Sequence, residues 1–193
     1  MRIERMVEYV EMARQFFTGA DLDYRGEHVT AVDMQAVPAA VQLGGPRIMI
    51  GGGGPRVLGV AGRLADIVSI NFNNASGKIG ADGVGSGTAA GTADKIEWIK
   101  AGAGDRFDQI ELEIAAYFTT VTDDGAAATQ AMATGLGLAA DELALHPHAL
   151  IGSVEHIVEA MLERRERYGI SYVTVGAKVL EDFAPVVAAL AGN

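Results

Sequence analysis

Four consecutive glycines, Gly51 to Gly54, form the part of this sequence best suited to hold a ligand. They follow a short apolar run over residues 47–50 and precede Pro55, which suits the first turn of a helix. Because glycine has no side chain, backbone N–H groups in such a loop can approach a ligand closely. Free N–H groups at a helix start also lie at the positive end of the helix dipole. The pattern predicts a strand, a loop that binds a phosphate group, and a helix.

Two familiar nucleotide-binding patterns do not fit this loop. The dinucleotide fingerprint G-x-G-x-x-G needs a further glycine where the chain has Arg56 or Val57, and residues 69–71 lack the acidic side chain that would bind a ribose. The P-loop pattern fails because Gly77 and Lys78 are not followed by Ser or Thr. Nicotinamide and nucleoside triphosphate cofactors are therefore disfavoured. A tight turn in which the glycines serve packing alone stays open as an alternative.

Two polar residues are candidates to complete the loop. Arg56 lies in the first turn of the expected helix, where its guanidinium could contact a phosphate or an acidic cofactor tail; plain solvent exposure is the alternative. Asn71 follows the next predicted strand, although asparagine is also common in turns. With Gly52, Gly53 and Gly54 they are the predicted cofactor-binding residues. No residue of the chain stands out as a catalytic group.

The other ionisable candidates give weaker patterns. His146 and His148 flank a proline, which indicates a loop, and no third histidine lies close, so no metal site is expected. Glu111 and Glu113 alternate with apolar residues and could point into a barrel, where a position near the start of the strand favours a role in stability. His156 lies in the first turn of a predicted helix, where capping or solvent exposure is the simplest role.

Composition narrows the classes of partner. The chain has 193 residues, no cysteine and a formal net charge of −10. Thiolate chemistry and disulfides are therefore excluded, and the acidic charge argues against nucleic acid. No apolar run reaches the roughly 18 residues of a membrane span. We expect a cytoplasmic protein that acts on a small-molecule substrate, with no nucleic-acid or membrane partner. Local amides must hold an anionic cofactor, because the overall field is negative.

Helices and strands are predicted to alternate along the chain. An amphipathic helix with a buried apolar stripe is expected over residues 1–18, followed by an extended excursion over residues 21–42. The first strand of the glycine-loop unit is expected to be buried on both faces. A long loop rich in glycine, which could be a lid over the cofactor or a plain connector, is expected over residues 72–91, and an irregular insert over residues 141–151. Strands are predicted over residues 47–50, 66–70, 110–121 and 170–175, and further helices over residues 55–65, 92–102, 126–138, 153–168 and 183–190.

This alternation predicts an α/β fold with a parallel sheet. A (β/α)₈ TIM barrel needs eight strands and usually about 250 residues, and this sequence opens in a helix with no strand before it. An open four-stranded sheet and half of a barrel both fit. We favour a partial barrel, strands five to eight with their helices, whose N-terminal half is absent. Residues 1–193 would then form one domain.

Several segments resemble the bacterial luciferase-like flavin and deazaflavin oxidoreductases. Residues 46–70 look like that family's glycine-loop unit, and residues 24–28 like its small hairpin. Residues 151–157 and 169–175 resemble its late helix entry and its last strand. The likeness is to the C-terminal half of these proteins. Within the family it is nearest to members that use the deazaflavin coenzyme F420, through the segments at residues 65–68, 95–98 and 103–107.

The resemblance implies that Gly52, Gly53 and Gly54, with the amide of Arg56 or Val57 nearby, bind the cofactor phosphate. It implies hydride transfer between coenzyme F420 and an organic substrate. An FMN-dependent monooxygenase on the same scaffold is one alternative. The family's early strands, which carry much of the ring pocket, have no counterpart here, so a truncated, non-catalytic β/α domain that self-associates is another. Half a barrel leaves apolar surface uncovered, which predicts a homo-oligomer.

Overall fold

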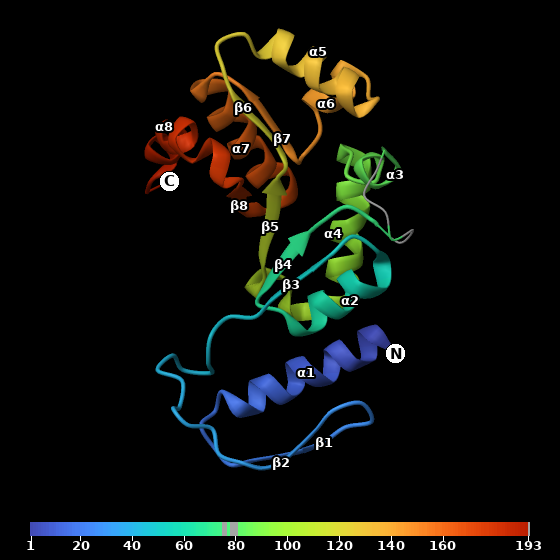
Figure 1. Ribbon diagram of the computed structural model, residues 1–193, viewed down its shortest axis with the longest axis vertical. Coiled ribbons are helices and arrows are strands. Elements are labelled where there is room, and N and C mark those ends of the chain that lie inside the picture. The colour runs from blue at the N-terminus through green and yellow to red at the C-terminus, as the bar shows by residue number, and fades with distance from the viewer. Residues whose placement is uncertain (75–76, 78–80, 193) are drawn as a thin grey trace.

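The computed structural model describes residues 1–74, 77 and 81–192. At its centre lies a four-stranded parallel sheet in the order β3-β4-β5-β8 (Figure 1). Each strand overlaps one of the four predicted strands, so the predicted α/β fold with a parallel sheet is confirmed. The strands span Met49–Gly52 (β3), Ile67–Ile70 (β4), Glu111–Ala116 (β5) and Ile170–Val175 (β8).

Helices connect these strands and pack on them (Figure 1). The α-helices span Arg2–Phe16 (α1), Pro55–Leu64 (α2), Ala81–Gly85 (α3), Ala89–Ala103 (α4), Gly125–Leu136 (α5), Ala140–Ala144 (α6), Val154–Tyr168 (α7) and Leu180–Leu190 (α8). Short 3₁₀ helices follow α4 and β8, at Gly104–Gln109 and Ala177–Val179. Among the described residues, no helix is both long enough and apolar enough to cross a membrane.

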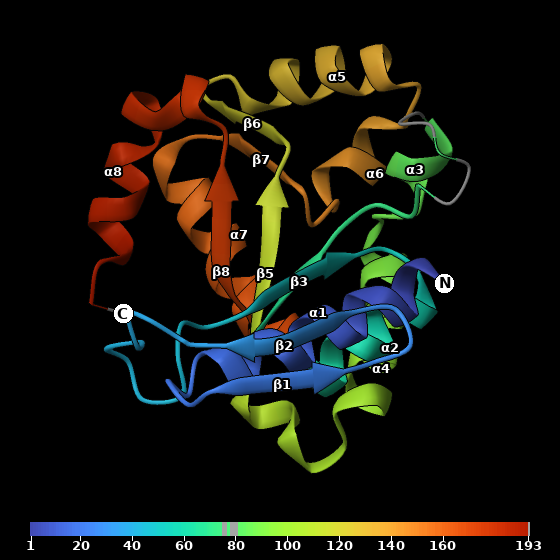
Figure 2. The same cartoon turned by 60° about the horizontal axis from the view of Figure 1, so that its bottom comes forward.

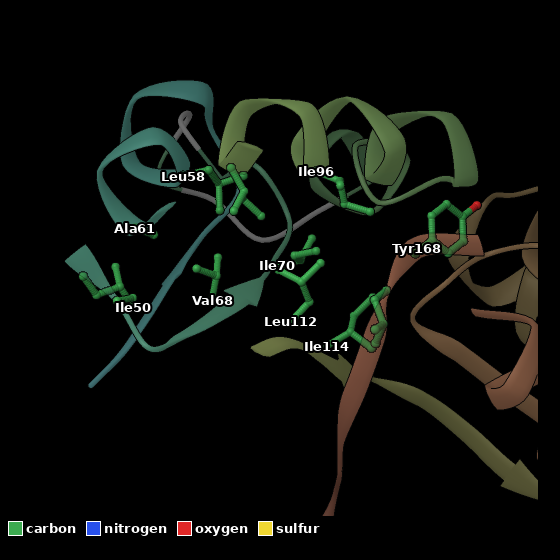
Figure 3. Packing of buried hydrophobic residues seen from close by; sticks show 12 residues of the cluster. Ile50, Leu58, Ala61, Val68, Ile70, Ile96, Leu112, Ile114 and Tyr168 are labelled. Carbon is green, nitrogen blue, oxygen red and sulfur yellow. The ribbon is translucent and has the colours of Figure 1, made fainter. Parts of the chain in front are cut away.

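Helices α2 and α4 cover one face of the sheet and enclose a hydrophobic core with it. They approach so closely that a Cβ atom at Gly62 or Gly102 would collide with the backbone of the other helix, so packing requires glycine at both positions. Burying one large aliphatic side chain of this core contributes about 1.5–3 kcal/mol. Figure 3 shows the residues that meet there, among them Ile50, Val68, Ile70, Leu112 and Ile114 from the strands and Leu58 and Ile96 from the helices.

The opposite face of β3 is uncovered, which corrects the prediction that this strand is buried on both faces. Ile50 is buried, whereas its neighbour Met49 is 44% exposed and Gly51 is also exposed. The prediction assumed helices on both sides of the strand, but α2 and α4 lie on the same side. The strand also begins two residues later than the predicted start at residue 47.

The N-terminal segment forms a helix and a small hairpin, as expected. Strands β1 (Leu22–Arg25) and β2 (Thr30–Met34) pair antiparallel, and Figure 2 shows them lying over α1. The Glu8 carboxylate of α1 accepts hydrogen bonds from the backbone N–H groups of His28 and Val29, at 2.7 and 2.8 Å. These bonds fix the hairpin turn on the helix.

The apolar stripe of α1 is only half-buried, contrary to the sequence prediction. None of the helix residues is buried. An open groove of about 470 Å³ runs along it, lined by Met6, Tyr9 and Val10 among others. Helix α2 and the hairpin each cover part of the helix, so the periodicity correctly marked an apolar face but overstated how much of it is enclosed.

The single strand predicted over residues 110–121 is in fact two strands, because the chain bends at Tyr117. There β5 ends and β6 (Phe118–Val121) leaves the central sheet to pair in parallel with β7 (Ala149–Gly152) (Figure 1). The backbone N–H of Tyr117 turns back to the carbonyl of Ala115, at 3.0 Å. Strand β7 lies where an irregular insert was expected.

The predicted long loop over residues 72–91 is also partly wrong. It contains α3 and the start of α4, which Thr88 caps by accepting a hydrogen bond from the N–H of Gly91. Thr92, where the sequence predicted the helix to begin, is buried within it. Residues 75–76 and 78–80, which the lid hypothesis included, lie outside the described residues.

Candidate functional site

The glycine loop joins the end of β3 to the start of α2 at the carboxyl edge of the sheet. Gly54 is the N-cap of α2, with φ −113° and ψ 158°, and gives no side-chain hydrogen bond to the first turn. The first N–H groups of a helix have no intrahelical acceptor. Pro55, the next residue, has no N–H to satisfy. The amides of this turn are therefore disposed toward an anion.

Packing explains part of the glycine run. A Cβ atom at Gly52 would collide with the Val57 side chain, and one at Gly53 would collide with the backbone of Phe72 and Asn73. Gly53 is accordingly buried. At Gly54 the nearest atom to an added Cβ would be 3.8 Å away, so that position has room for a side chain. The packing interpretation thus accounts for Gly52 and Gly53 but leaves Gly54 unexplained.

The side chain of Arg56 reaches α1. Its guanidinium forms an ion pair with the Glu4 carboxylate, and its side chain is 68% exposed. An ion pair this exposed contributes little to stability, in general about 0–1 kcal/mol. The side chain therefore loses little if it exchanges this partner for another anion.

Asn71 lies beside the loop and joins several elements. Its backbone N–H donates to the carbonyl of Gly52, at 2.9 Å, and its side-chain amide donates to the hydroxyl of Ser69, at 3.1 Å. Its side-chain oxygen accepts a hydrogen bond of 2.6 Å from the hydroxyl of Tyr117, at the end of β5. The structure thus brings Asn71 against Gly51 and Gly52 of the loop, while the guanidinium of Arg56 pairs with Glu4.

A row of residues crosses the sheet on the face opposite α2 and α4. The strand register aligns Gly51 with Ser69, Ser69 with Glu113, and Glu113 with Tyr172. Glu113 is only 3% exposed, and its Oε2 atom has no hydrogen-bond partner among the residues that the structure describes. Of the two predicted inward-facing glutamates, only Glu113 lies in this row. The other, Glu111, forms an ion pair with the exposed Arg47, at 2.5 Å.

Tyr117 directly follows β5, four residues after Glu113, and its hydroxyl stays protonated. Burial raises the pKa of Tyr117, and the nearby carboxylate of Glu113 raises it further. Its ring stacks on that of His148, with centroids 5.4 Å apart and an interplanar angle of 19°. The phenol is thus a hydrogen-bond donor held in place by its ring.

His146 and His148 are both fully buried beside the rings of Phe72, Tyr117 and Phe118. The Nδ1 atom of His148 lies 2.8 Å from the carbonyl of Ala115, so it carries the proton. Its Nε2 atom has no hydrogen-bond partner in the described part of the chain. Burial lowers the pKa of His148 to about 3, which makes the ring neutral. Within the described ranges, no group of three or more His, Cys, Asp or Glu side chains could hold a metal ion.

His146 ties the same region to α3. Its Nδ1 accepts a hydrogen bond from the backbone N–H of His148, at 3.2 Å, so Nε2 carries the proton and donates to the carbonyl of Val84, at 3.1 Å. His156, the remaining candidate, is exposed, and its backbone N–H donates to the capping hydroxyl of Ser153, at 3.3 Å. Of the two roles expected for its side chain, solvent exposure is confirmed, whereas the capping group is the side chain of Ser153.

Sequence reasoning missed Lys95, a residue of α4 that is only 1% exposed. Its ammonium group donates to the carbonyls of Asn71 and Ser86, at 2.8 and 2.7 Å. Burial lowers the pKa of Lys95 to about 8. The signal was its spacing: the buried positions Thr92, Lys95 and Ile99 recur at intervals of three and four residues, which places the lysine on the buried face of the helix.

Comparisons with known proteins support this architecture. A family model described as luciferase-like monooxygenase matches residues 1–141. No protein of curated function matches the sequence. Solved structures match over nearly the whole chain, among them the coenzyme F420-dependent tetrahydromethanopterin reductase from Methanopyrus kandleri, with 17% identity and a TM-score of 0.71. That match covers 96% of this chain and 61% of the reductase.

Two further structures agree with the first. A riboflavin lyase has 14% identity and a TM-score of 0.66, over 98% of this chain and 57% of the lyase. An F420-dependent secondary alcohol dehydrogenase has 15% identity and a TM-score of 0.64, over 96% of this chain and 59% of the dehydrogenase. At these identities the likeness shows the fold alone. This chain spans about three fifths of the length of each of the three structures.

Proposed function

The chain belongs to the luciferase-like monooxygenase family, and from that premise we propose that it is an oxidoreductase that passes hydride between the deazaflavin coenzyme F420 and a small organic molecule. The observation that carries the proposal is the uncapped first turn of α2, which lies behind Gly54 at the carboxyl edge of a parallel sheet. Barrel enzymes bind and transform their substrates at that edge. A helix start with free amides there suits the phosphate of such a cofactor.

Each residue of the loop has a different part in this proposal. Gly54 and the amides that follow it would bind the phosphate, because that position is open. Gly52 and Gly53 would allow the loop to pack closely enough to present those amides. The exposed guanidinium of Arg56 would reach the phosphate or an acidic cofactor tail by leaving Glu4. Asn71 would stand between the phosphate and the rest of the ligand.

The sheet face opposite α2 and α4 would contact the ring of the cofactor. The hydrogen-bonded series Ser69, Asn71 and Tyr117 offers an amide and hydroxyl groups beside the loop. When bound, the deazaflavin supplies the hydride donor or acceptor. The residues of this chain would hold and orient it and would keep the phenol of Tyr117 protonated. FMN is the alternative cofactor, because its phosphate suits the same helix start, and the activity would then be that of a monooxygenase.

We also propose that residues 1–193 form one domain that supplies strands five to eight of a TIM barrel. The central sheet has two edge strands, β3 and β8. The face of the sheet opposite α2 and α4 exposes large side chains, such as Met49 and Tyr172, that a closed barrel would cover. The share of the solved structures that the chain spans supports this proposal. Activity would then require a further polypeptide segment that carries the remaining strands.

Self-association of this chain is the second candidate, and the same exposed apolar residues favour it. Light scattering coupled to size-exclusion chromatography separates the candidates. A homo-oligomer that binds neither coenzyme F420 nor FMN supports a non-catalytic domain. Quenching of cofactor fluorescence on addition of the protein supports the oxidoreductase. The affinities for coenzyme F420 and FMN obtained from such titrations decide between the two cofactors. Cytoplasmic location stays a prediction.

A further inference from the structure

Lys95 is a buried lysine whose ammonium group donates to two backbone carbonyls, and packing alone does not require a charge there. A buried charge is costly unless hydrogen bonds compensate it, and an apolar side chain would fit the buried face of α4 at lower cost. The two hydrogen-bond partners of Lys95 in the described part of the chain are backbone carbonyls, those of Asn71 and Ser86. One carbonyl follows β4 and the other follows α3. The lysine therefore joins the end of β4 to the end of α3.

The residues that carry both carbonyls are connected to the glycine loop by hydrogen bonds and packing. Asn71 donates its backbone N–H to Gly52. The hydroxyl of Ser86 accepts a hydrogen bond of 2.7 Å from the backbone N–H of Asn73. The backbone of residues 72–73 is in turn the surface against which Gly53 packs. A displacement of either carbonyl would therefore move the backbone that supports the loop.

We propose that Lys95 is a positioning residue for the cofactor site: its ammonium group holds the ends of β4 and α3 so that residues 71–73 keep the glycine loop in its anion-binding form. The proposal rests on the proposed function for the identity of the ligand. It does not place Lys95 in contact with that ligand. Its effect is transmitted through the carbonyls of Asn71 and Ser86.

The ionisable groups around Lys95 allow its protonation to be followed. Burial lowers the pKa of His146 and of His148, that of His148 to about 3, and the positive charge of Lys95 lowers both further. Burial lowers the pKa of Arg164, on α7, only to about 10, and the pKa of Tyr117 is raised. Of these groups, only Lys95 changes charge between pH 7 and 9. The phosphate of FMN is already fully ionised in this range, since its second pKa is about 6.

The test compares Lys95→Met with Lys100→Met in the whole chain. Lys100 lies on the same helix but is exposed and pairs with Glu97, at 2.8 Å. Affinity for coenzyme F420 and for FMN is measured by fluorescence titration from pH 7 to 9, and hydrogen exchange is measured at the amides of Asn71 and Asn73. We expect Lys95→Met to weaken affinity about tenfold at pH 7 and to expose both amides. Wild-type affinity should fall with a midpoint near pH 8, and Lys100→Met should behave as wild type.

Three results would overturn the proposal. One is a folded Lys95→Met protein with wild-type affinity, and another is unchanged exchange at Asn71 and Asn73. If Lys95→Met does not fold, the wild-type profile decides, and an affinity that is flat from pH 7 to 9 rejects the role of Lys95. If the wild type binds neither cofactor, the proposed function fails separately, and the exchange data still test whether Lys95 holds residues 71–73.

Discussion

The hydroxyl of Tyr117 donates a hydrogen bond of 2.6 Å to the side-chain oxygen of Asn71, which joins the carboxyl ends of β5 and β4. Tyr117 lies at the bend between the end of β5 and the start of β6. The bend therefore brings a protonated phenol to the edge of the sheet beside the glycine loop.

Replacing Tyr117 with Phe tests that bond. The ring can still stack on His148, so we expect the free energy of unfolding to fall by only about 0.5–1.5 kcal/mol, the net value of one hydrogen bond. Affinity for coenzyme F420 should fall several-fold, because the side chain of Asn71 loses a partner. Urea denaturation and fluorescence titration measure the two effects. Tyr172→Phe, on the same sheet face, is the control; equal losses in both variants would argue against a specific role for Tyr117.

Acid should destabilise the protein through His148. Burial lowers the pKa of His148 from 6.5 to about 3 in the folded chain. Below pH 6.5 the unfolded chain gains a proton that the folded chain does not, so stability falls as the pH falls. Between pH 6.5 and 4 the loss should approach about 3 kcal/mol.

The variant His148→Gln should remove that part of the pH dependence, although its stability at pH 7 should also be lower. Urea denaturation across the pH range measures both. The exposed His156→Gln serves as the control and should keep the wild-type slope. A wild-type slope in His148→Gln would show that other groups cause the acid sensitivity.

Single alanine substitutions should separate the packing role of the glycine loop from its binding role. A Cβ atom at Gly53 would collide with the backbone of Phe72 and Asn73, so Gly53→Ala should cost about 1–3 kcal/mol of stability. Gly54 has open space and an extended backbone, so Gly54→Ala should change stability by less than about 0.5 kcal/mol. Thermal denaturation of the two variants measures the difference. Equal melting temperatures would contradict the crowding at Gly53.

Local signals were sufficient for the elements that begin and end at marked residues. Ser153 caps α7 and Gly169 ends it in a left-handed conformation, and both residues could be recognised in the sequence. The bend at Tyr117 could not be recognised, because residues 110–121 contain no glycine or proline and are rich in residues that favour strands. The residues after Tyr117 form β6 and pair with β7, whose first residue lies 31 positions after the first residue of β6, and no local signal marks that pairing.

The candidate site was predictable where it depends on backbone and not where it depends on distant side chains. Gly52, Gly53 and Asn71 come together because the loop and the end of β4 share one edge of a parallel sheet. Arg56 turns to Glu4, which is 52 residues away in sequence, so local reasoning gave no indication of that ion pair. Lys95 was not singled out, because a fully buried lysine is rare and its partners are backbone carbonyls that the sequence does not mark.

The most direct test of the account is a fluorescence titration of coenzyme F420 and FMN against the wild type and Gly54→Asp, with Gly54→Asn as the neutral control. Aspartate suits an N-cap and the open space at Gly54, so the variant should fold and gain a few tenths of a kcal/mol of stability. Its carboxylate should occupy the free amides of α2 and repel a phosphate, which predicts loss of binding at unchanged fold, with an intermediate loss for asparagine. Wild-type affinity in a folded Gly54→Asp protein would contradict the claim that the start of α2 holds the cofactor phosphate.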